Sequence, residues 1–513
     1  MFKLVPLKRI FVPFLIFLLT GLILTFQSCK KKRSEMATVL FKQTHNKIFK
    51  DVDPDDFSEV FKKVFDEERK KLKHPDFIMA YYEENHYEPV FVMRHLFNGD
   101  LSKAANYLSK ANEHGLNPEM FQANELIAQI ERFRNKNGFK TVEEAYKDMA
   151  ELELTTANSL INYSNALQYG VISPKSIYQR YFLVTKQPDS ASMAKVFEIG
   201  AMQNYLDSIQ PKDPQYIALQ NFLKNGLQPP GLSSEETKRI LVVNLERLRW
   251  KNKPHEQKYV IVNIPDFTLN VIDSGKSVLS MKVCVGQGRN MDYKNTLSAY
   301  ADSCKEDNPG EHETPLLNSL IYGVDVNPVW NIPKSIANKE IIVEAAKDKY
   351  YLSNSNIDVY KDDKLVENPE NIDWTKITKA NLPYEFKQEP GSGNSLGLIK
   401  FMFNNKSNVY LHDTPVKSAF EKKMRAVSHG CVRLGDPKGL ALSLFGEGDK
   451  FDTISDDMEQ DNPDPTSIYL PKKVPVYITY VTSWTDEKNA VQFRKDVYGL
   501  DIVLYDHLQR LMH

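Results

Sequence analysis

The hydrophobic pattern of this 513-residue chain changes its period once, near residue 251. From about residue 40 to 250, apolar residues recur at spacings of three and four, as at Val60 and Val64, which indicates amphipathic helices. After Trp250 the apolar residues alternate with a period of two, which indicates strands. A chain with these two halves is expected to be of the α+β class, with an N-terminal all-α scaffold followed by a mixed, β-rich domain.

Local signals support the change from helix to strand. Ser233 and Glu236 have the spacing of a capping box, so a helix is predicted to start there and to run to Trp250. Further on, Ser274 and Gly275 separate two runs rich in β-branched residues, and such a pair predicts a tight hairpin.

These patterns divide the chain into domains. Residues 41–250 are predicted to form the helical scaffold domain and 251–485 the β-rich domain, with 486–513 as a C-terminal extension. Within the β-rich domain, residues 336–395 are irregular and polar, with clusters of Asn, Asp, Pro and Gly. Because strands resume after this insertion, we predict that it forms a lid beside a functional site.

The N-terminus has the layout of an export signal. Basic residues precede an apolar run over 11–26, which is shorter than the roughly 20 residues of a spanning helix, and Cys29 follows. We expect 1–28 to be a signal peptide and 29–40 a lipidated N-terminus and linker, with lipid on Cys29. The basic residues directly after Cys29 favour the alternative of an uncleaved single membrane anchor. Either way, the protein is expected to be periplasmic and attached to a membrane.

Charge argues against nucleic acid as a partner. Lys and Arg number 66 and Asp and Glu 67, which gives a net charge of −1. A protein that binds the phosphate backbone needs a basic excess, and this chain has none.

Of the four cysteines, Cys29, Cys284, Cys304 and Cys431, three remain if Cys29 carries lipid. An odd number leaves at least one free thiol in an oxidising compartment. Cys284 lies in an apolar strand pattern and is most simply a buried structural residue, although a bridge to Cys304 stays open.

The densest set of reactive side chains lies between residues 408 and 437. His412 ends an apolar strand pattern, and Cys431 lies in a loop before a predicted helix that starts at Asp436 and Pro437. A thiol attacks as the thiolate and needs a neighbouring base, a role that suits His412.

Neighbouring residues fit the same chemistry. Gly430 lets the backbone approach a substrate carbonyl, so N–H groups around Gly430 and Cys431 are candidates for an oxyanion hole, and Arg433 offers a positive fork to a carboxylate. Two other interpretations stay open, namely an inert buried thiol and a zinc site formed by His412, His429 and Cys431. The zinc site lacks a fourth ligand at a familiar spacing.

The segment from His412 to Arg433, with Ser428-His429-Gly430-Cys431-Val432-Arg433, resembles the signature of the L,D-transpeptidase (YkuD-like) catalytic domain. Similarity continues through 244–250, 262–271, 313–319, 327–337, 397–403 and 410–420, and this longer set is similar to the large YcbB-like periplasmic enzymes. In the N-terminal half, 107–121 and 165–174 resemble their helical scaffold.

The resemblance implies roles for individual residues. It implies that Cys431 is the acyl-accepting nucleophile, that His412 is its general base, and that backbone near Asp413 orients the histidine. It also implies substrate or structural roles for Ser428, His429 and Arg433, and acylation of the thiol by carbapenem-type β-lactams. We expect no cofactor and no metal.

The expected function is a peptidoglycan L,D-transpeptidase that forms 3→3 cross-links between stem peptides through a cysteine acyl-enzyme. One alternative is an L,D-carboxypeptidase or endopeptidase that uses water as the acceptor. The other is a non-catalytic wall-binding lipoprotein that keeps the fold only as a scaffold. The expected partners are peptidoglycan stem peptides and, through the lipid anchor, a membrane.

Overall fold

The computed structural model describes residues 33–135, 138–252, 254–288, 306–378, 380–460 and 464–512. The predicted signal peptide, the predicted lipid site Cys29 and the candidate bridge residue Cys304 lie outside these ranges. Within them, no helix combines the length and the apolar composition that crossing a membrane requires. Cys284 is a buried free thiol, in agreement with its structural interpretation.

An N-terminal helical region is followed by a mixed, strand-rich domain, which confirms the predicted α+β class. The longer helices of the first half are α2 (Glu35–Thr44), α3 (Pro54–Glu68), α4 (Pro75–Glu84), α5 (Asp100–Ser109), α6 (Ala123–Arg134), α7 (Val142–Tyr169), α10 (Met202–Ile209), α11 (Pro214–Lys224) and α12 (Ser234–Arg249). Short helices α8 (Pro174–Ile177) and α9 (Ser190–Ala194) lie between α7 and α10. Within the described residues, the first helix begins at Glu35, before the predicted start of the scaffold at 41.

The chain forms two compact units whose boundary differs from the predicted one. The first unit comprises residues up to 105 together with 122–160 and 196–203, and the second comprises 106–121, 161–195 and 204–513. The change from helix to strand nevertheless falls where the period changes, because α12 ends at Arg249 and the first strand begins at Lys258. The last helices before the sheet therefore belong to the same compact unit as the sheet.

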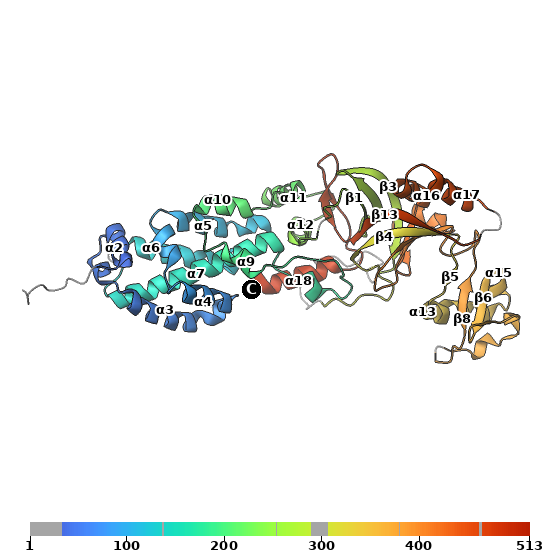
Figure 1. Ribbon diagram of the computed structural model, residues 1–513, viewed down its shortest axis with the longest axis horizontal. Helices are drawn as coiled ribbons and strands as arrows, with labels where there is room; N and C mark the ends of the chain where they lie inside the picture. Colours follow the sequence, from blue (N-terminus) through green and yellow to red (C-terminus); the bar gives the residue numbers. More distant parts are fainter. Residues whose placement is uncertain are drawn as a thin grey trace, which may run out of the picture. The chain divides into compact units, whose positions relative to one another are not determined.

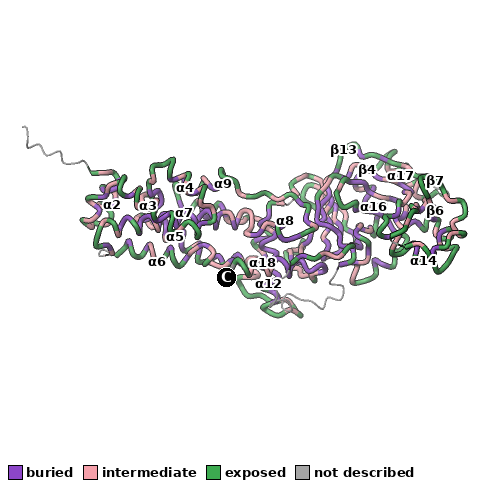
Figure 2. The backbone as a smooth tube through the Cα atoms, turned by 90° about the horizontal axis from the view of Figure 1, so that it is seen from below, coloured by how far each residue is buried: buried purple, intermediate pink, exposed green. Residues whose placement is uncertain are grey.

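The first unit is organised around α7, most of which is buried (Figure 2). Glu153 lies on this helix with no exposed surface. Its carboxylate accepts hydrogen bonds from the Tyr82 hydroxyl at 2.7 Å and from the backbone N–H groups of Phe91 and Val92 at 3.0 Å. Burial raises the pKa of Glu153 to about 7, although these donors favour the carboxylate.

Glu153 predicts a specific dependence of stability on pH. Because its folded-state pKa lies above the ordinary value of 4.5, protonation stabilises the fold below pH 4.5, and this contribution is lost as the pH rises through 7. Relative to Glu153→Gln, the wild type should lose about 2 to 3 kcal/mol of unfolding free energy between pH 5 and 8. Denaturant unfolding of both proteins at the two pH values measures this difference. An identical pH dependence in the two proteins would contradict the assignment.

Helix α12 connects the two halves and is buried along almost its whole length. It begins as predicted, with the Ser233 hydroxyl accepting from the Glu236 N–H at 3.1 Å. Its buried charges are paired: Arg249 lies 2.7 Å from Glu246, and Arg247 forms an ion pair with Asp501. Breaking such a pair leaves a buried charge without compensation, so these contacts constrain how α12 packs.

The strand-rich domain contains a nine-stranded sheet in the order β11-β3-β12-β10-β9-β4-β13-β1-β2. Its strands are β1 (Lys258–Asn263), β2 (Thr268–Asp273), β3 (Lys276–Gly286), β4 (Leu317–Val326), β9 (Ile399–Phe403), β10 (Leu411–His412), β11 (Ala426–Ser428), β12 (Val432–Leu434) and β13 (Thr466–Thr479). An additional pairing of β2 with β3 closes the sheet on itself, which removes most exposed edges. The β2–β3 turn contains Ser274 and Gly275 at positive φ, which confirms the predicted hairpin.

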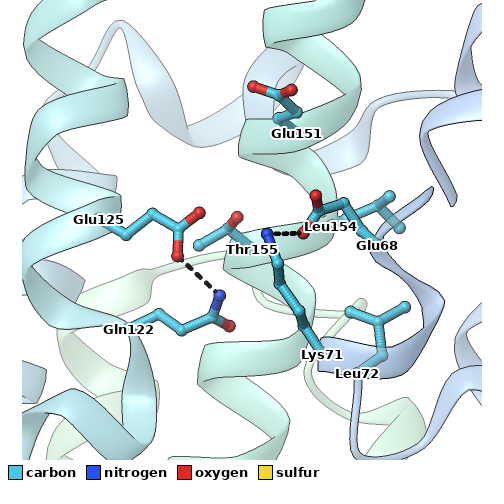
Figure 3. Close-up of a pocket in the computed structure, with 8 residues that line it drawn as sticks. All are labelled: Glu68, Lys71, Leu72, Gln122, Glu125, Glu151, Leu154 and Thr155. Atoms are coloured by element: carbon cyan, nitrogen blue, oxygen red, sulfur yellow. Dashed lines mark hydrogen bonds and ion pairs between the residues drawn. The ribbon is translucent and has the colours of Figure 1, made fainter.

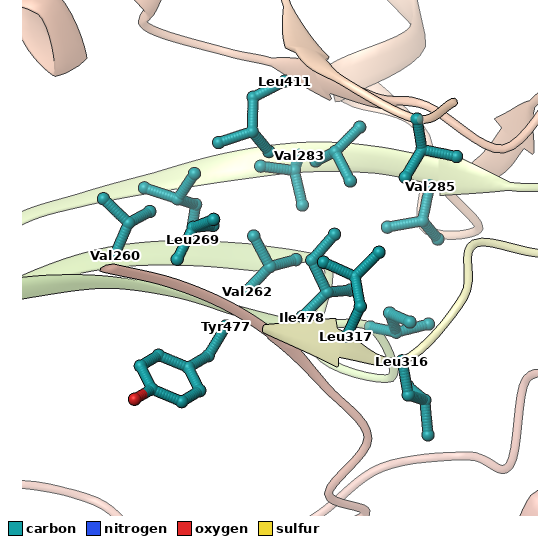
Figure 4. Close-up of a cluster of buried hydrophobic side chains, with 14 of the residues drawn as sticks. Val260, Val262, Leu269, Val283, Val285, Leu316, Leu317, Leu411, Tyr477 and Ile478 are labelled. Carbon is teal, nitrogen blue, oxygen red and sulfur yellow. The ribbon is translucent and has the colours of Figure 1, made fainter. Parts of the chain in front are cut away.

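The core of this domain lies inside the closed sheet (Figure 4). Val262, Val283, Leu317, Leu411 and Ile478 come from five different strands and are at most 2% exposed. Figure 1 shows β1, β3, β4 and β13 side by side, with α16 (Pro437–Phe445) and α17 (Asp449–Asp457) next to them. Helix α16 begins as predicted, capped by the Asp436 side chain.

The predicted insertion, 336–395, belongs to a folded body that begins earlier, at Trp330, and has its own core (Figure 1). We call this whole body the insertion below. Its elements are β5 (Trp330–Asn331), α13 (Lys334–Ile336), the π-helical turn η8 (Ala337–Ile341), α14 (Ile342–Lys347), α15 (Tyr351–Asn354), β6 (Ile357–Lys361), β7 (Lys364–Leu365) and β8 (Glu385–Gln388). Its strands form a separate sheet in the order β5-β8-β6-β7. Trp374 and Phe386 lie in its core at 3% and 2% exposure, so the insertion is a small packed body.

The C-terminal segment is an integral part of the strand-rich domain. It forms β14 (Ser483–Thr485), β15 (Val491–Phe493) and α18 (Leu500–Met512). Tyr498, Val503 and Leu504 are at most 2% exposed and belong to the core cluster of the closed sheet. Although 486–513 was predicted as an extension, its apolar residues complete the core of this domain.

Candidate active site

Strand pairing brings His412 and Cys431 to the same side of the sheet. Strand β10 runs parallel to β12 with Leu411 opposite Val432 and His412 opposite Arg433. Leu411 and Val432 have no exposed surface and point into the closed core. Because side chains alternate along a strand, His412 and Arg433 point to the opposite face, and Cys431 follows the same alternation just before β12.

His412 is held as a neutral imidazole. It is 4% exposed, and its Nδ1–H donates to the main-chain carbonyl of Asp413, which leaves Nε2 as the acceptor. Burial and the charge of Arg433 lower the pKa of His412 to about 4, against the opposing effect of the carbonyls of Asp413 and Leu396. The ring is therefore unprotonated at neutral pH, as a general base must be.

Cys431 is a free thiol that remains partly accessible. Burial raises its pKa above the ordinary value, whereas the Tyr410 N–H, Arg433 and Lys400 favour the thiolate. The balance leaves a protonated thiol in the free protein, so a proton acceptor is needed when the sulfur attacks. The combination of a neutral thiol and a neutral imidazole matches this requirement.

The loop that carries Cys431 is closed by hydrogen bonds within itself. The Ser428 hydroxyl donates to the Cys431 carbonyl at 2.5 Å and accepts from the Gly430 N–H at 3.2 Å. Gly430 has φ +116°, a conformation that favours glycine. Since the Gly430 N–H already has an acceptor, the Cys431 N–H is the better of the two oxyanion-hole candidates.

Two residues outside the predicted site stabilise this loop through hydrogen bonds. The Thr314 hydroxyl donates to the Gly430 carbonyl and accepts from the Gly286 N–H, both at 2.8 Å. The Tyr498 hydroxyl donates to the Gly286 carbonyl at 2.7 Å and accepts from the Thr314 N–H at 3.2 Å. Sequence reasoning missed both residues, because nothing local in the chain indicates that 314 and 498 meet beside 430.

Arg433 and Lys400 make this face of the sheet electropositive. Arg433 is partly buried, and its Nε has no hydrogen-bond acceptor among the residues that the structure describes. Lys400 lies opposite His412 on β9 and pairs with Asp325 at 2.9 Å. Arg433 also lines the cavity described below, and its predicted role towards a carboxylate stays a prediction.

Asp413 acts on the site through backbone geometry. Its carboxylate accepts from the Leu398 N–H at 3.0 Å and pairs with Lys417 at 2.5 Å. Gly397 packs against it at positive φ, so closely that a Cβ at this position would lie 2.5 Å from the Asp413 side chain. These contacts fix the turn next to His412 and the carbonyl that accepts from its ring.

A cavity of about 1190 Å³ lies over this face. His412, Cys431 and Arg433 line it from the sheet, and Trp330, Lys334 and Glu340 line it from the insertion. His429 lies at its rim, where its Nε2 is 2.5 Å from the Glu340 carboxylate. The structure thus brings together all the predicted site residues that it describes, with Asp413 behind His412.

Within the described ranges, no group of three or more His, Cys, Asp or Glu side chains is placed to hold a metal ion. A smaller cavity of about 120 Å³ lies in the first unit beside Lys71 and Gln122 (Figure 3). There Lys71 pairs with Glu68 at 2.6 Å, and the Gln122 amide donates to Glu125 at 2.9 Å. Because these polar groups bond to one another, we assign this cavity no function.

Comparison with known proteins gives matches in both halves of the chain. Residues 257–444 match the YkuD family model, described as an L,D-transpeptidase catalytic domain, and residues 76–223 match the model described as a scaffold domain. A Haemophilus influenzae protein named "Putative L,D-transpeptidase" is 30% identical over 261 residues, which are 51% of this chain and 48% of that protein. The chain thus matches about half the length of this curated relative.

Among solved structures, an L,D-transpeptidase from Mycobacterium smegmatis aligns with 44% of this chain and 58% of its own, at 12% identity and a TM-score of 0.19. The two family matches agree with the resemblance found in the sequence, both for the helical scaffold and for the domain that carries Cys431.

Proposed function

We propose that this chain, which carries an L,D-transpeptidase catalytic domain and a scaffold domain, is a peptidoglycan L,D-transpeptidase that forms 3→3 cross-links through an acyl-enzyme on Cys431. The observation that carries the proposal is the placement of the Cys431 thiol, the neutral His412 ring and the Arg433 guanidinium on one face beneath a single cavity. Small-molecule sites usually measure about 300 to 1,000 Å³. A cavity of about 1190 Å³ therefore has room for peptide substrates.

The first half-reaction forms the acyl-enzyme. His412 takes the thiol proton as Cys431 Sγ attacks the carbonyl of the third residue of a donor tetrapeptide stem, and the Cys431 N–H faces the developing oxyanion. The C–N bond to the terminal D-residue then breaks, and the departing amine takes the proton from His412. A thioester on Cys431 remains.

The second half-reaction transfers the acyl group. The free amine of a neighbouring stem attacks the thioester carbonyl, and an amide bond forms as the C–S bond breaks. The proton that the nitrogen loses passes to the departing sulfur, so that the Cys431 thiol is restored. Arg433 lines the cavity beside Cys431, and its guanidinium is suited to hold a carboxylate of a stem peptide while this happens.

The proposal includes a periplasmic location with a lipid anchor on Cys29. Its support is the sequence pattern of residues 1–29, namely a basic start, a short apolar run and a cysteine. Labelling of the wild type but not of Cys29→Ala with a radioactive fatty acid would support the anchor, and equal labelling would contradict it.

The direct test of function uses purified protein and tetrapeptide muropeptides. We expect a cross-linked dimer, tripeptide stems and released D-amino acid, separated by liquid chromatography and identified by mass. Tripeptide without dimer would favour the L,D-carboxypeptidase alternative. No turnover and no acylation would favour the wall-binding lipoprotein.

We expect the insertion to control whether the acyl-enzyme reacts with an amine or with water. Asn331 and Lys387 are paired neighbours on β5 and β8, so residues 332–386 can be excised and replaced by an Asn-Gly turn. Water competes with an acceptor amine that is present at far lower concentration, and a covering element favours the amine by excluding water and positioning it. The excised variant should therefore give at least a roughly tenfold lower ratio of dimer to tripeptide.

Acylation by a carbapenem, followed by intact mass, serves as the control for folding of the excised variant. An unchanged ratio of dimer to tripeptide in a variant that still acylates would show that the insertion does not control the choice of acceptor.

A further inference from the structure

Three segments that are distant in sequence meet at the rim of the cavity in what we call the rim cluster, formed by His312, Glu340 and His429. The Glu340 carboxylate comes from η8 of the insertion and lies 2.5 Å from His429 Nε2. The His312 ring meets the His429 ring edge to face, with centroids 4.7 Å apart. All three residues line the same cavity as Cys431.

The rim cluster is open to a ligand, whereas His412 is not. The side chains of His429 and Glu340 are 34% and 46% exposed, and His412 is 4% exposed. The paired carboxylate and imidazole can therefore exchange a proton with a molecule that enters the cavity. The Glu340 carboxylate and the His429 ring resemble the carboxylate–histidine pair of a catalytic triad. In such a pair the carboxylate orients the histidine and stabilises the imidazolium that forms.

The second half-reaction of the proposed function requires such a proton acceptor. An aliphatic amine is an ammonium ion at neutral pH and attacks a thioester only after it loses a proton. His412 is 4% exposed and serves the thiol in the first half-reaction, whereas the acceptor ammonium enters from solvent and must pass its proton to a group that solvent can reach. A second base beside the thioester would meet the need.

We propose that His429, oriented by Glu340, is the base that takes the proton of the acceptor amine, so that Glu340 is a positioning residue for acyl transfer. This inference rests on the proposed transpeptidase function. In the step, the ammonium gives one proton to His429 Nδ1, since Nε2 faces the Glu340 carboxylate, and the free amine forms the bond to the acyl carbon. As the C–S bond breaks, its electron pair stays on Cys431 Sγ, and the second proton that the new amide nitrogen loses passes to this sulfur and restores the thiol. The imidazolium, paired with Glu340, then releases the proton to solvent.

The surroundings of the pair are consistent with this role. Lys339 precedes Glu340 in η8 and forms an ion pair with Glu311, which anchors the turn that presents Glu340. Burial, His429 and Lys339 lower the pKa of His312, so that ring is neutral and adds no charge against the imidazolium. The titratable groups that face His429 are thus Glu340 and His312, with Lys339 and Glu311 next to them.

Under this proposal the insertion contributes a residue, Glu340, to the acyl-transfer step. Glu340 belongs to the insertion and His429 to the loop of Cys431, so the base is complete only when both are in place. A nucleophile that is already the free base at neutral pH should not need this base before it attacks. Hydroxylamine is such a nucleophile, because it is largely unprotonated at pH 7 and attacks thioesters directly.

The test compares wild type, Glu340→Gln and the matched control Glu344→Gln, which changes an exposed carboxylate one turn further along that pairs with Lys347. Each full-length protein is given tetrapeptide donor and a diamino-acid stem as acceptor. We expect Glu340→Gln to acylate within twofold of wild type, to form at least tenfold less dimer and to react with hydroxylamine at the wild-type rate. Glu344→Gln should match wild type in all three measurements.

Each contrary result has a distinct meaning. Unchanged dimer formation by Glu340→Gln, with normal acylation, overturns this inference and leaves the proposed function standing. Equal losses in dimer formation and in hydroxylamine capture also overturn it, since they indicate a structural role for Glu340. A wild type that never acylates overturns the proposed function and this inference together.

Discussion

Cys431→Ala is expected to lose all turnover of tetrapeptide stems and all acylation by a carbapenem. Cys431 is a free thiol that lines the same cavity as His412, and a thiol is a far better nucleophile at neutral pH than the hydroxyl groups that line this cavity as well. Removing the nucleophile of a cysteine or serine acyltransferase costs on the order of a millionfold in rate, which here means no detectable product. Intact mass should show one carbapenem adduct per wild-type chain and none on the variant.

The matched control for this prediction is Cys284→Ala. Cys284 is fully buried on β3, opposite Arg433, and burial raises its pKa. Its thiol is therefore inert, and the variant should keep both the adduct and turnover. An adduct that persists in Cys431→Ala would place the reactive group elsewhere and would end the transpeptidase proposal.

His412→Ala is expected to reduce the acylation rate at pH 7 by about 10² to 10⁴, the usual contribution of a general base. Some acylation should survive, because a thiol with an ordinary pKa of about 8.5 is about 3% thiolate at pH 7. Burial raises the pKa of Cys431, so the surviving fraction is smaller than this and the loss correspondingly larger. Rates of carbapenem adduct formation measure the effect.

The pH profile identifies the cause of that loss. Without a base, the rate follows the thiolate and should rise about tenfold per pH unit from 7 towards the thiol pKa. In the wild type, His412 has a pKa of about 4 and is already unprotonated above pH 5, so its rate should depend little on pH between 5 and 8 and fall below that range. Parallel profiles for the two proteins would show that His412 is not the base.

The sequence alone was sufficient for the architecture and for choosing Cys431 and His412 as the candidate reacting residues. The change of hydrophobic period near 251 predicted the helical and strand-rich halves, because the two structures bury apolar side chains at different spacings. The signature around Cys431 predicted this residue as the nucleophile and His412 as its base, because the spacing of a short motif can be read directly in the linear sequence.

The sequence did not predict the domain boundaries. Residues 486–513 are predicted as an extension because the sequence does not reveal which distant residues their apolar side chains pack against. In the fold, Val503 and Leu504 complete the core of the closed sheet. The helices before residue 250 likewise divide between two compact units, a result of long-range packing that periodicity does not encode.

What the sequence determined by itself is the identity of the chemical groups and the local elements that carry them, since capping, alternation and motif spacing all act over a few residues. Only the tertiary structure decided how those groups are supported and tuned. Thr314 and Tyr498 hold the loop of Cys431, and Glu340 reaches His429 across 89 positions in the chain. The pKa values of His412 and Cys431 likewise follow from burial and from the charge of Arg433, which exist only once the strands have paired and the insertion has folded.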